Sequence, residues 1–512
     1  MATNGINANL IRLNGLSSGL DTEAIVTSLL KIDQLKVDKQ FKLAEELEWK
    51  GDAYRAINLK LKSFRETYMT TQFPATNMFS SSAYNAFAVT MGTQTSAVSI
   101  TAGSNASVGQ LTIDSIERLA TAAKVSSSGE MFDATKNINS TLEEAFGNIE
   151  DVFVDGKISF SINDKTFTFS KDTTISSMVN KINSSDAGVT VGYSSLTRKF
   201  TITSKATGTD GKIDIKNISG KAFAESEETV GASAFKIAVV NKTGDNAKLT
   251  IEGVPVERTS NTFTIDGITY TLKDQSTTPI KFSVARDVDS VYNKIKGFID
   301  GYNSLIAELQ AKLDEEVYSD YGPLTDAERD ELSETQIAQW EEKAKSGLLR
   351  SDSGVRALLQ DLRSAFYSVV EGAGGSAASI GLETGYMSKT GQIVINEAKL
   401  KNALANNPDQ VANIFTKVNK AEDGSTKYKE SGLVTRMSGI FNSYLTNSVD
   451  TTLETNGRAV TEANNRLDQL EDWLAKNEEK YYARFTAMET ALAKLNSQTS
   501  WISSLLGSQA QG

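Results

Sequence analysis

The chain has 512 residues and a net charge of −11, and it contains neither cysteine nor histidine. This length allows roughly three or four domains, and the acidic balance argues against a nucleic-acid partner. Without thiols or imidazoles the usual nucleophile–base pairs and most transition-metal ligands are missing, so we expect no enzyme activity, no cofactor and no metal site. No apolar run approaches the ~18 residues of a membrane span, and residues 1–14 lack the pattern of an ordinary secretory signal. We therefore expect no membrane contact, and either a cytoplasmic location or export without a cleaved signal.

A long helix is predicted near the N-terminus. Asp21 or Thr22 is a suitable N-cap, and Phe73-Pro74 ends the helix. Its first part carries a short apolar stripe of Ile25, Leu29 and Ile32. Its second part repeats an apolar residue every seven positions, at Leu47, Tyr54, Leu61 and Tyr68. This helix packs beside the C-terminal helix, on copies of itself, or in a bundle within one subunit, and for residues 47–68 the bundle is favoured.

The middle of the chain reads as antiparallel β structure. Alternating apolar residues predict strands at residues 87–91, 97–101, 110–116, 158–162, 167–169, 189–193, 200–203, 213–215, 249–251, 263–265, 268–272 and 282–284. A short helix with Ile175, Met178, Val179 and Ile182 on one stripe interrupts them. Linkers at residues 126–129 and 222–231 predict one β unit inserted into another.

Three Asp-Gly pairs in this region invite a calcium-site interpretation: Asp155-Gly156, Asp210-Gly211 and Asp266-Gly267. None has the spaced acidic ligands of an EF-hand loop. We expect all three to be turns.

Helices return at Asp287, with apolar residues at helical spacing from Val288 to Leu309. Residues 313–345 then hold eleven acidic and three basic residues, a net charge of −8. This insertion is expected to be a solvated, partly helical excursion, with a charged contact to a neighbouring subunit as the alternative. Further helices are predicted at residues 355–366, 399–415 (broken at Asn407-Pro408) and 433–453.

The last sixty residues carry the strongest periodicity. An apolar residue recurs every seven positions at Val460, Leu467, Leu474, Tyr481, Met488, Leu495 and Ile502. A second seam runs through Ala463 and Leu470, fails at Asn477 and Arg484, and shifts by one place to Phe485, Leu492 and Leu506. This pattern predicts a coiled-coil helix that needs a partner to bury its stripe.

The predicted fold is a multidomain α+β protein, in which long terminal helices form a coiled-coil or bundle stem and antiparallel β head domains are inserted between them. Residues 1–45 and 460–512 are assigned to the terminal coiled coil. Residues 46–82 and 287–459 form a helical leg with the acidic insertion 313–345. Residues 83–125 and 235–286 form an inner β head, and residues 126–234 an outer one.

Several motifs together resemble the flagellar hook-associated protein 2 family. Gly15-Leu16-Ser17-Ser18-Gly19-Leu20-Asp21-Thr22 resembles the family's entry motif, and Trp49-Lys50-Gly51-Asp52-Ala53-Tyr54-Arg55 its first long helix. Val179-Asn180-Lys181-Ile182-Asn183 is similar to the "IN" motif of flagellins and hook proteins. Asp300-Gly301-Tyr302-Asn303 and Asn396-Glu397-Ala398-Lys399-Leu400 resemble the family's C-terminal region. At position 51 glycine replaces the family's usual charged residue.

The resemblance implies a cap at the distal tip of the bacterial flagellar filament, which retains exported flagellin and promotes its folding and polymerisation. It implies a homo-oligomeric ring, most often a pentamer, with flagellin, the flagellar type III export apparatus and its chaperone as partners. The alternatives are a hook–filament junction protein or flagellin, and an adhesin for mucin or a host surface. Candidate residues for self-assembly or flagellin contact are Ile25, Leu29, Ile32, Val460, Leu467, Leu470, Leu474, Tyr481, Phe485, Met488, Leu492, Leu495 and Ile502.

Overall fold

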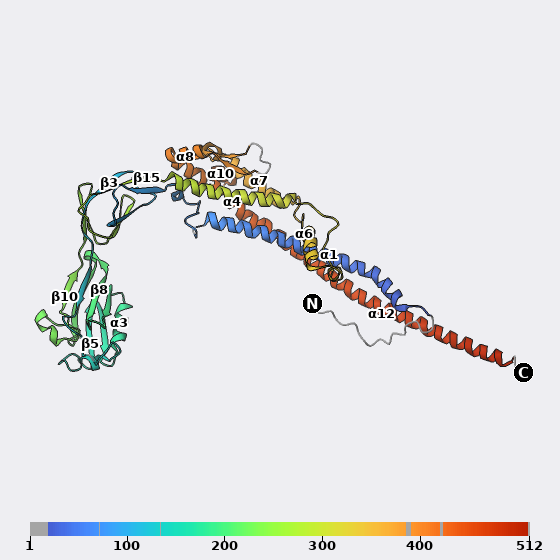
Figure 1. The fold of residues 1–512 in the computed structure, drawn as a ribbon, viewed down its shortest axis with the longest axis horizontal. Helices are drawn as coiled ribbons and strands as arrows, with labels where there is room; N and C mark the ends of the chain where they lie inside the picture. Colours follow the sequence, from blue (N-terminus) through green and yellow to red (C-terminus); the bar gives the residue numbers. More distant parts are fainter. Residues whose placement is uncertain (1–18, 71, 134, 386–390, 420–422, 510–512) are drawn as a thin grey trace. The chain divides into compact units, whose positions relative to one another are not determined.

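The computed structural model describes residues 19–509 apart from residues 71, 134, 386–390 and 420–422. Residues 15–18 of the entry motif lie outside this part. Two compact units divide the chain: one combines residues 1–81 with 292–512, and the other spans residues 82–291. The first unit is helical and the second is built from antiparallel strands (Figure 1).

The helical unit contains the N-terminal helix α1 and the C-terminal helix α12, joined by shorter helices and one small hairpin. Its elements are α1 (Thr22–Met69), α4 (Val288–Asp314), α5 (Asp326–Asp330), α6 (Glu334–Ala344), α7 (Ser353–Tyr367), β16 (Leu382–Thr384), β17 (Ile393–Ile395), α8 (Glu397–Asn406), α9 (Pro408–Thr416), α10 (Gly424–Glu430), α11 (Leu433–Ser443) and α12 (Asp450–Gln509). A π-helical stretch, Tyr444–Val449, joins α11 to α12 without a break. Helix α1 starts as predicted, because the Asp21 carboxylate accepts a hydrogen bond from Ala24 N at 3.0 Å. It ends at Met69, before the expected stop at Phe73-Pro74.

Aromatic packing forms the centre of the helical bundle. The Phe64 ring of α1 lies 5.7 Å from Phe298 of α4 and 5.7 Å from Phe441 of α11, measured between centroids. Tyr302 of α4 is fully buried and lies 4.5 Å from Phe366 of α7. The second half of α1 is therefore a bundle core within one subunit, as favoured for residues 47–68.

Arg436 ties three helices of this bundle together. Its side chain is buried, and Nε donates to the carbonyl of Tyr428 at 2.8 Å. Nη1 donates to the carbonyls of Ala365 and Ser368, and Nη2 donates to those of Val369 and Lys429. These acceptors lie at the C-terminal ends of α7 and α10, where unpaired carbonyls carry partial negative charge. All five guanidinium N–H groups are thus used, while burial lowers the pKa of Arg436.

The β unit contains two hydrophobic cores. The first lies between the sheets β1-β15-β3-β11-β12 and β13-β14-β2, and the second between the sheets β10-β9-β5-β6 and β4-β8-β7, with α3 packed on it. The strands are β1 (Phe87–Met91), β2 (Val98–Ala102), β3 (Gly109–Arg118), β4 (Ala122–Ser126), β5 (Lys157–Ile162), β6 (Lys165–Ser170), β7 (Val189–Tyr193), β8 (Phe200–Thr207), β9 (Lys212–Ser219), β10 (Val240–Thr243), β11 (Ala247–Ile251), β12 (Val254–Arg258), β13 (Thr262–Ile265), β14 (Ile268–Leu272) and β15 (Ile280–Arg286), with the helices α2 (Leu142–Phe146) and α3 (Ile175–Asn183). Strands β4 and β10 pair into the second core, although they lie outside residues 126–234. The division into inner and outer heads otherwise stays a prediction.

The Asp-Gly pairs lie at turns. Asp155-Gly156 and Asp266-Gly267 each have two consecutive positive φ angles, as the tight turns of β-hairpins require. Asp210-Gly211 ends a short 3-10 turn before β9. Within the described part of the chain, no cluster of three or more acidic residues is arranged to hold a metal ion.

Within the described residues, four asparagines pair with both backbone groups of another residue, six to 141 positions away in the sequence. The Asn183 amide at the end of the IN motif donates to Val191 O at 2.9 Å and accepts from Val191 N at 2.6 Å. The same double contact joins Asn217 to Phe223, Asn261 to Ala120, and Asn303 to Ile393. A side-chain amide offers the same donor and acceptor as a peptide group, so each of these asparagines extends the backbone hydrogen bonding.

Candidate assembly surfaces of the terminal helices

Helices α1 and α12 lie side by side and run in opposite directions (Figure 1). Their contacts show the direction: Gln40 Nε2 donates to Ala463 O at 3.1 Å, and Asn456 Nδ2 donates to Leu47 O at 2.9 Å. Gly51 is needed beside this second contact, since a Cβ there would lie 2.7 Å from the Asn456 amide nitrogen. The glycine that departs from the family pattern therefore makes room for a side chain of α12.

The predicted seam of α12 faces α1 over most of its length. Ala463 is buried, and the following candidate residues are half-buried: Val460, Leu467, Leu470, Leu474, Tyr481, Phe485, Met488 and Leu492. Arg484 is exposed while Phe485 is half-buried, so the one-residue shift seen in the sequence occurs in the structure. Such a shift locally changes the winding of a coiled coil.

A polar contact replaces the apolar seam at Asn477. Its Nδ2 donates to the Asp33 carboxylate of α1 at 3.1 Å, and the Tyr481 hydroxyl donates to the same oxygen at 3.4 Å. Lys36 lies 3.2 Å from the other carboxylate oxygen and 4.5 Å from the centre of the Trp473 ring. The Asp33 side chain is only 10% exposed. Sequence reasoning noticed the gap at Asn477 but missed its partner Asp33.

The seam of α1 differs from the predicted one. Val26 is fully buried, and Val37 and Ala44 are buried too. Ile25 is half-buried, and Leu29 and Ile32 are 37% and 63% exposed. The stripe of Ile25, Leu29 and Ile32 is therefore not the α12-facing seam. The spacing of seven residues between Val37, Ala44 and Gly51 could have revealed the true seam, but two of these residues are small.

The exposed stripe of α1 continues a face that is covered further along the helix. Ile25, Leu43 and Leu61 are 18 residues apart, which is five turns of an α-helix. Leu61 is fully buried in the bundle, whereas Leu43 is 46% exposed. Below, "the α1 stripe" means Ile25, Leu29, Ile32, Leu35 and Leu43. The bundle covers one end of this face and leaves the other end open.

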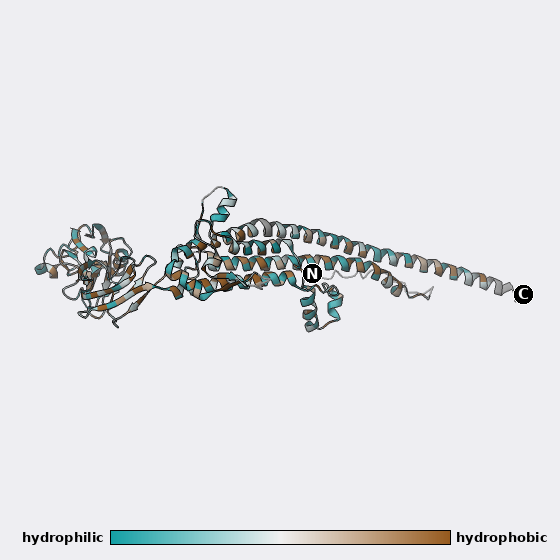
Figure 2. Cartoon of the chain, turned by 90° about the horizontal axis from the view of Figure 1, so that it is seen from above, coloured by the Kyte–Doolittle hydropathy of each residue, from teal (hydrophilic) through white to brown (hydrophobic). Residues whose placement is uncertain are grey.

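The far end of α12 also exposes apolar side chains. Leu495, Trp501 and Ile502 are 57%, 65% and 49% exposed, although Leu495 and Ile502 continue the seam. Below, "the α12 tip" means these three residues. Figure 2 shows hydrophobic positions recurring along α12 among hydrophilic ones. Large exposed apolar side chains gathered at one place mark interaction sites in soluble proteins.

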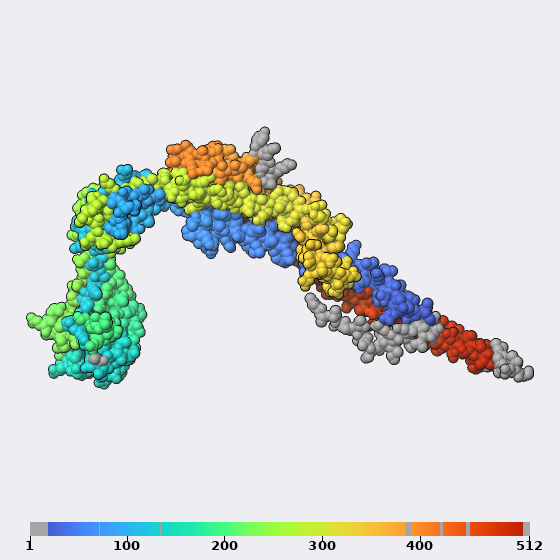
Figure 3. Space-filling view, in the orientation of Figure 1, coloured from blue at the N-terminus to red at the C-terminus, as the bar shows by residue number. Residues whose placement is uncertain are grey.

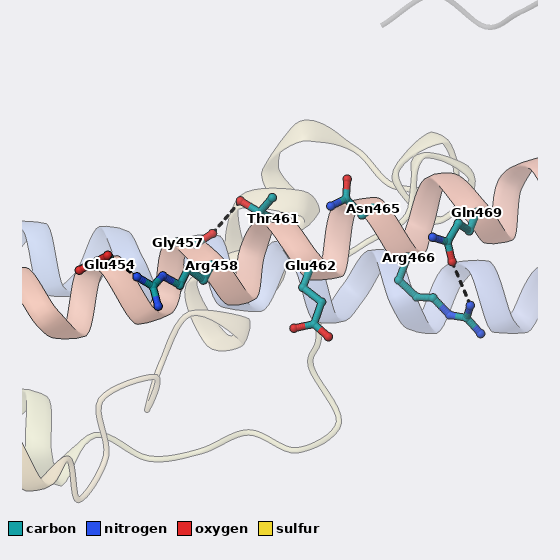
Figure 4. Close-up of a pocket in the computed structure, with 8 residues that line it drawn as sticks. All are labelled: Glu454, Gly457, Arg458, Thr461, Glu462, Asn465, Arg466 and Gln469. Atoms are coloured by element: carbon teal, nitrogen blue, oxygen red, sulfur yellow. Dashed lines mark hydrogen bonds and ion pairs between the residues drawn. The ribbon is translucent and has the colours of Figure 1, made fainter.

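The opposite face of α12 is hydrophilic. Eight residues from this single helix line a hollow of about 910 Å³ (Figure 4): Glu454, Gly457, Arg458, Thr461, Glu462, Asn465, Arg466 and Gln469. Arg458 pairs with Glu454, and Arg466 with Gln469 at 3.2 Å. One helix face with internally paired charges lacks the convergent groups of a small-molecule site. Across the helices that the structure describes, none is both long and apolar enough to cross a membrane.

Comparisons with known proteins agree with these features. A family model described as "Flagellar hook-associated protein 2 C-terminus" matches residues 244–497, and the N-terminal model of the same family matches residues 18–123. Flagellar hook-associated protein 2 of Halalkalibacterium halodurans is 29% identical over 95% of this chain and 98% of its own length. The protein of that name from Thermotoga maritima is 26% identical over 82% of this chain and 67% of its own.

The fold is similar to a solved structure as well. The crystal structure of the flagellar cap protein FliD D1-D2-D3 domains from Escherichia coli covers 79% of this chain and 99% of its own, with a TM-score of 0.55 and 19% identity. At that identity the match concerns the fold alone. The two models of one family lie in order on the chain, and the relatives of that name align along it. The chain belongs to the flagellar hook-associated protein 2 family.

Proposed function

We propose that this chain is the structural cap of the bacterial flagellar filament, located at its distal tip. There it prevents the loss of exported flagellin and promotes flagellin folding and polymerisation. Family membership supports the cap, and a solved structure with this fold is that of the flagellar cap protein from Escherichia coli. A structural role without catalysis suits a chain that has no histidine and no cysteine.

The observation that carries the proposal is the uncovered apolar surface on the terminal helices. Apart from the half-buried Ile25, the α1 stripe and the α12 tip expose large apolar side chains that the described part of the subunit leaves open. Burying each such side chain contributes about 1.5–3 kcal/mol. A helix pair of this kind is most stable when a further helix covers it.

The partners that we propose for these surfaces are other copies of the chain, in a ring such as a pentamer, and flagellin. The chain reaches the filament tip through the flagellar type III export apparatus, with the help of a dedicated chaperone. Of the candidate residues, those from Val460 to Leu492 are already half-buried within the subunit. Ile25, Leu29, Ile32, Leu495 and Ile502 are therefore the ones that we propose for contacts between subunits or with flagellin.

Labelling the protein on intact cells tests the location. Electron microscopy should find the label only at the distal end of the flagellum. Label at the hook–filament boundary would show that the protein is a junction protein rather than a cap. Label along the shaft would show that it is a filament subunit. Binding of the cell-free protein to mucin, with no flagellar label, would favour the adhesin instead.

A pair of variants tests the surface. Leu495→Ser with Ile502→Ser removes apolar area from the α12 tip and should lower the oligomer mass measured by light scattering and shorten the filaments. The matched control is Lys494→Ser with Gln498→Ser, which changes exposed polar residues of the same segment. Equal oligomer mass and filament length for both variants would contradict the assignment of the tip.

A further inference from the structure

The acidic insertion is a closed module rather than an open excursion. Where it leaves α4 and returns to α7, its two ends are bonded to each other. Ser351 N donates to Leu313 O at 3.2 Å, and Ser346 Oγ donates to Glu316 O at 2.7 Å. Gly347 N donates to the Glu315 carboxylate at 3.1 Å. Below, "the strap" means residues 315–349, which begin and end at the same place on the bundle.

The strap has its own internal structure. Both of its helices start with a capping box, at Thr325 and at Ser333. Trp340 Nε1 donates to Gly322 O at 2.8 Å, and its ring lies 4.6 Å from that of Tyr321. The Lys343 ammonium lies 4.5 Å from the centre of the Tyr321 ring. These contacts fix α6 against the preceding loop, so the strap can act as one body.

Charged and aromatic contacts fasten the strap to α1. Lys42 Nζ lies 2.7 Å from a Glu328 carboxylate oxygen, and Lys345 Nζ lies 4.7 Å from the centre of the Trp49 ring. Burial would raise the pKa of Glu328, but hydrogen bonds from Lys42 and Thr325 outweigh it and hold that pKa below its usual value. The strap therefore meets α1 through ionised groups.

Two of the three basic residues of the strap share one carboxylate within it. Arg329 and Lys345 both bond to the Glu341 carboxylate, at 2.5 and 2.6 Å. On α1, the pKa of Glu45 is raised by burial first and then by the neighbouring Glu48; of the strap residues, Arg329 and Lys345 lower it and Glu341 raises it. Charged groups of both signs on the strap thus lie close to this acidic stretch of α1.

The strap and α12 hold opposite sides of the same segment of α1. Lys42, Glu45 and Trp49 follow helical spacing and face the strap. Gln40 and Leu47 bond to α12 from the other side. In Figure 3 the yellow strap lies over the blue helix α1 beside the red helix α12.

We propose that the insertion is a strap that fastens α1 against α12 at the point where the bundle passes into the two-helix pair. The order of the first half of α1 then depends on contacts made about 300 residues later in the chain. The strap is released when its charges are screened or removed. This inference does not require the cap function, because it concerns one subunit.

Hydrogen exchange on the full-length protein tests the strap. Glu328→Gln with Lys345→Met removes both fastenings to α1 and leaves the net charge unchanged. We expect exchange of the amides at residues 30–50 to become at least tenfold faster. The control is Asp330→Asn with Arg350→Met, an equal charge exchange at exposed positions. Unchanged exchange in the first variant, or the same increase in the control, would overturn the proposal.

Two further readouts separate release from unfolding. Protection of α6 should stay close to that of the unmodified protein, because the Arg329–Glu341 ion pair and the contacts of Trp340 with Gly322 and Tyr321 remain, although the Lys345–Glu341 ion pair is lost. High salt should speed exchange of α1 in the unmodified protein but add little in the released variant. Loss of protection in α6 would mean that the changed residues are needed for the folding of the insertion instead. A changed oligomer mass with unchanged exchange of α1 would assign the insertion to a contact between subunits.

Discussion

Asp33 of α1 and Asn477 of α12 meet across the seam of the terminal helices, with a hydrogen bond of 3.1 Å. The pair lies among apolar residues, and Asp33 has only a small exposed fraction. A polar pair at a core position of a coiled coil costs stability, but it favours the one register in which both groups are satisfied. The seam is therefore built for a defined alignment of α1 and α12.

The first prediction concerns this pair. Asn477→Leu alone should weaken the α1–α12 contact by about 1–3 kcal/mol, because Asp33 loses a donor while staying buried. Asp33→Leu together with Asn477→Leu should restore or exceed the original stability. Exchange protection of the seam amides measures both. A double variant weaker than the single one would show that the apolar seam cannot close at this position.

Two glycines of α4 make a matched comparison. A Cβ on Gly301 would lie 2.9 Å from atoms of the Tyr68 ring, whereas one on Gly297 would meet nothing within 4 Å. Gly297→Ala should raise the free energy of unfolding of the bundle by about 0.5–1 kcal/mol, because glycine is the more flexible residue in the unfolded chain. Gly301→Ala should lower it by about 1–3 kcal/mol through overpacking. The free energy of unfolding of each variant can be measured by denaturant unfolding, with helix content as the signal. An increase in both variants would refute the tight contact between Gly301 and Tyr68.

The IN motif supplies a third prediction. Asn183→Ala leaves the N–H and C=O of Val191 without their side-chain partner, and Asn180→Ala changes an exposed residue of the same helix. The first change should destabilise the second core by about 1–3 kcal/mol, and the second by less than about 0.5 kcal/mol. Exchange at β7 is the measurement. Equal losses of stability in the two variants would mean that the contact between Asn183 and Val191 adds nothing to the stability of the second core.

Arg436 gives the largest expected loss. Arg436→Met removes the donor to five carbonyls and should cost about 3–5 kcal/mol. Arg436→Lys keeps the charge but not the planar five-donor fork, so it should rescue only part of this loss. Arg356→Met, at an exposed position of α7, is the control and should stay within about 0.5 kcal/mol. Full rescue by lysine would show that charge alone matters at this position.

The long elements were predictable because their periodicity is strong. Seven apolar residues at intervals of seven predicted α12, and the failure at Arg484 with recovery at Phe485 placed the shift of its seam. On α1 the same reasoning chose Ile25, Leu29 and Ile32 over Val26 and Ala44. In the sequence pattern of α1, the large apolar residues that turn out to be exposed are more prominent than the small ones that are buried. Only the position of α12 shows which face of α1 is covered.

Contacts between distant polar residues were not predictable from one sequence. Strands β4 and β12 were not predicted from the sequence, because Lys124 and Glu257 break their short apolar runs. The insertion was expected to be solvated because its acidic residues dominate its composition. Arg329 and Lys345 bond to Glu341 within it, and Lys345 also contacts Trp49 of α1. Asparagine in a loop or at a helix end indicates a turn. Its use as a partner for a strand becomes visible only when the strand is in place.

The four asparagines that each bond to both backbone groups of another residue also make the protein vulnerable to slow chemical ageing. Hydrolysis of the Asn303 amide, for example, would convert it to aspartate, which has no N–H to offer Ile393 O. The carboxylate oxygen that replaces the NH2 group would then face the Ile393 carbonyl oxygen, and attraction at this contact would become repulsion, while the other oxygen could still accept from Ile393 N. Asparagine is among the residues that heat damages first. Loss of ammonia from one side chain would thus loosen segments 90 residues apart in the sequence, so a cap left for long at an old filament tip would weaken at these amides without any break in its chain.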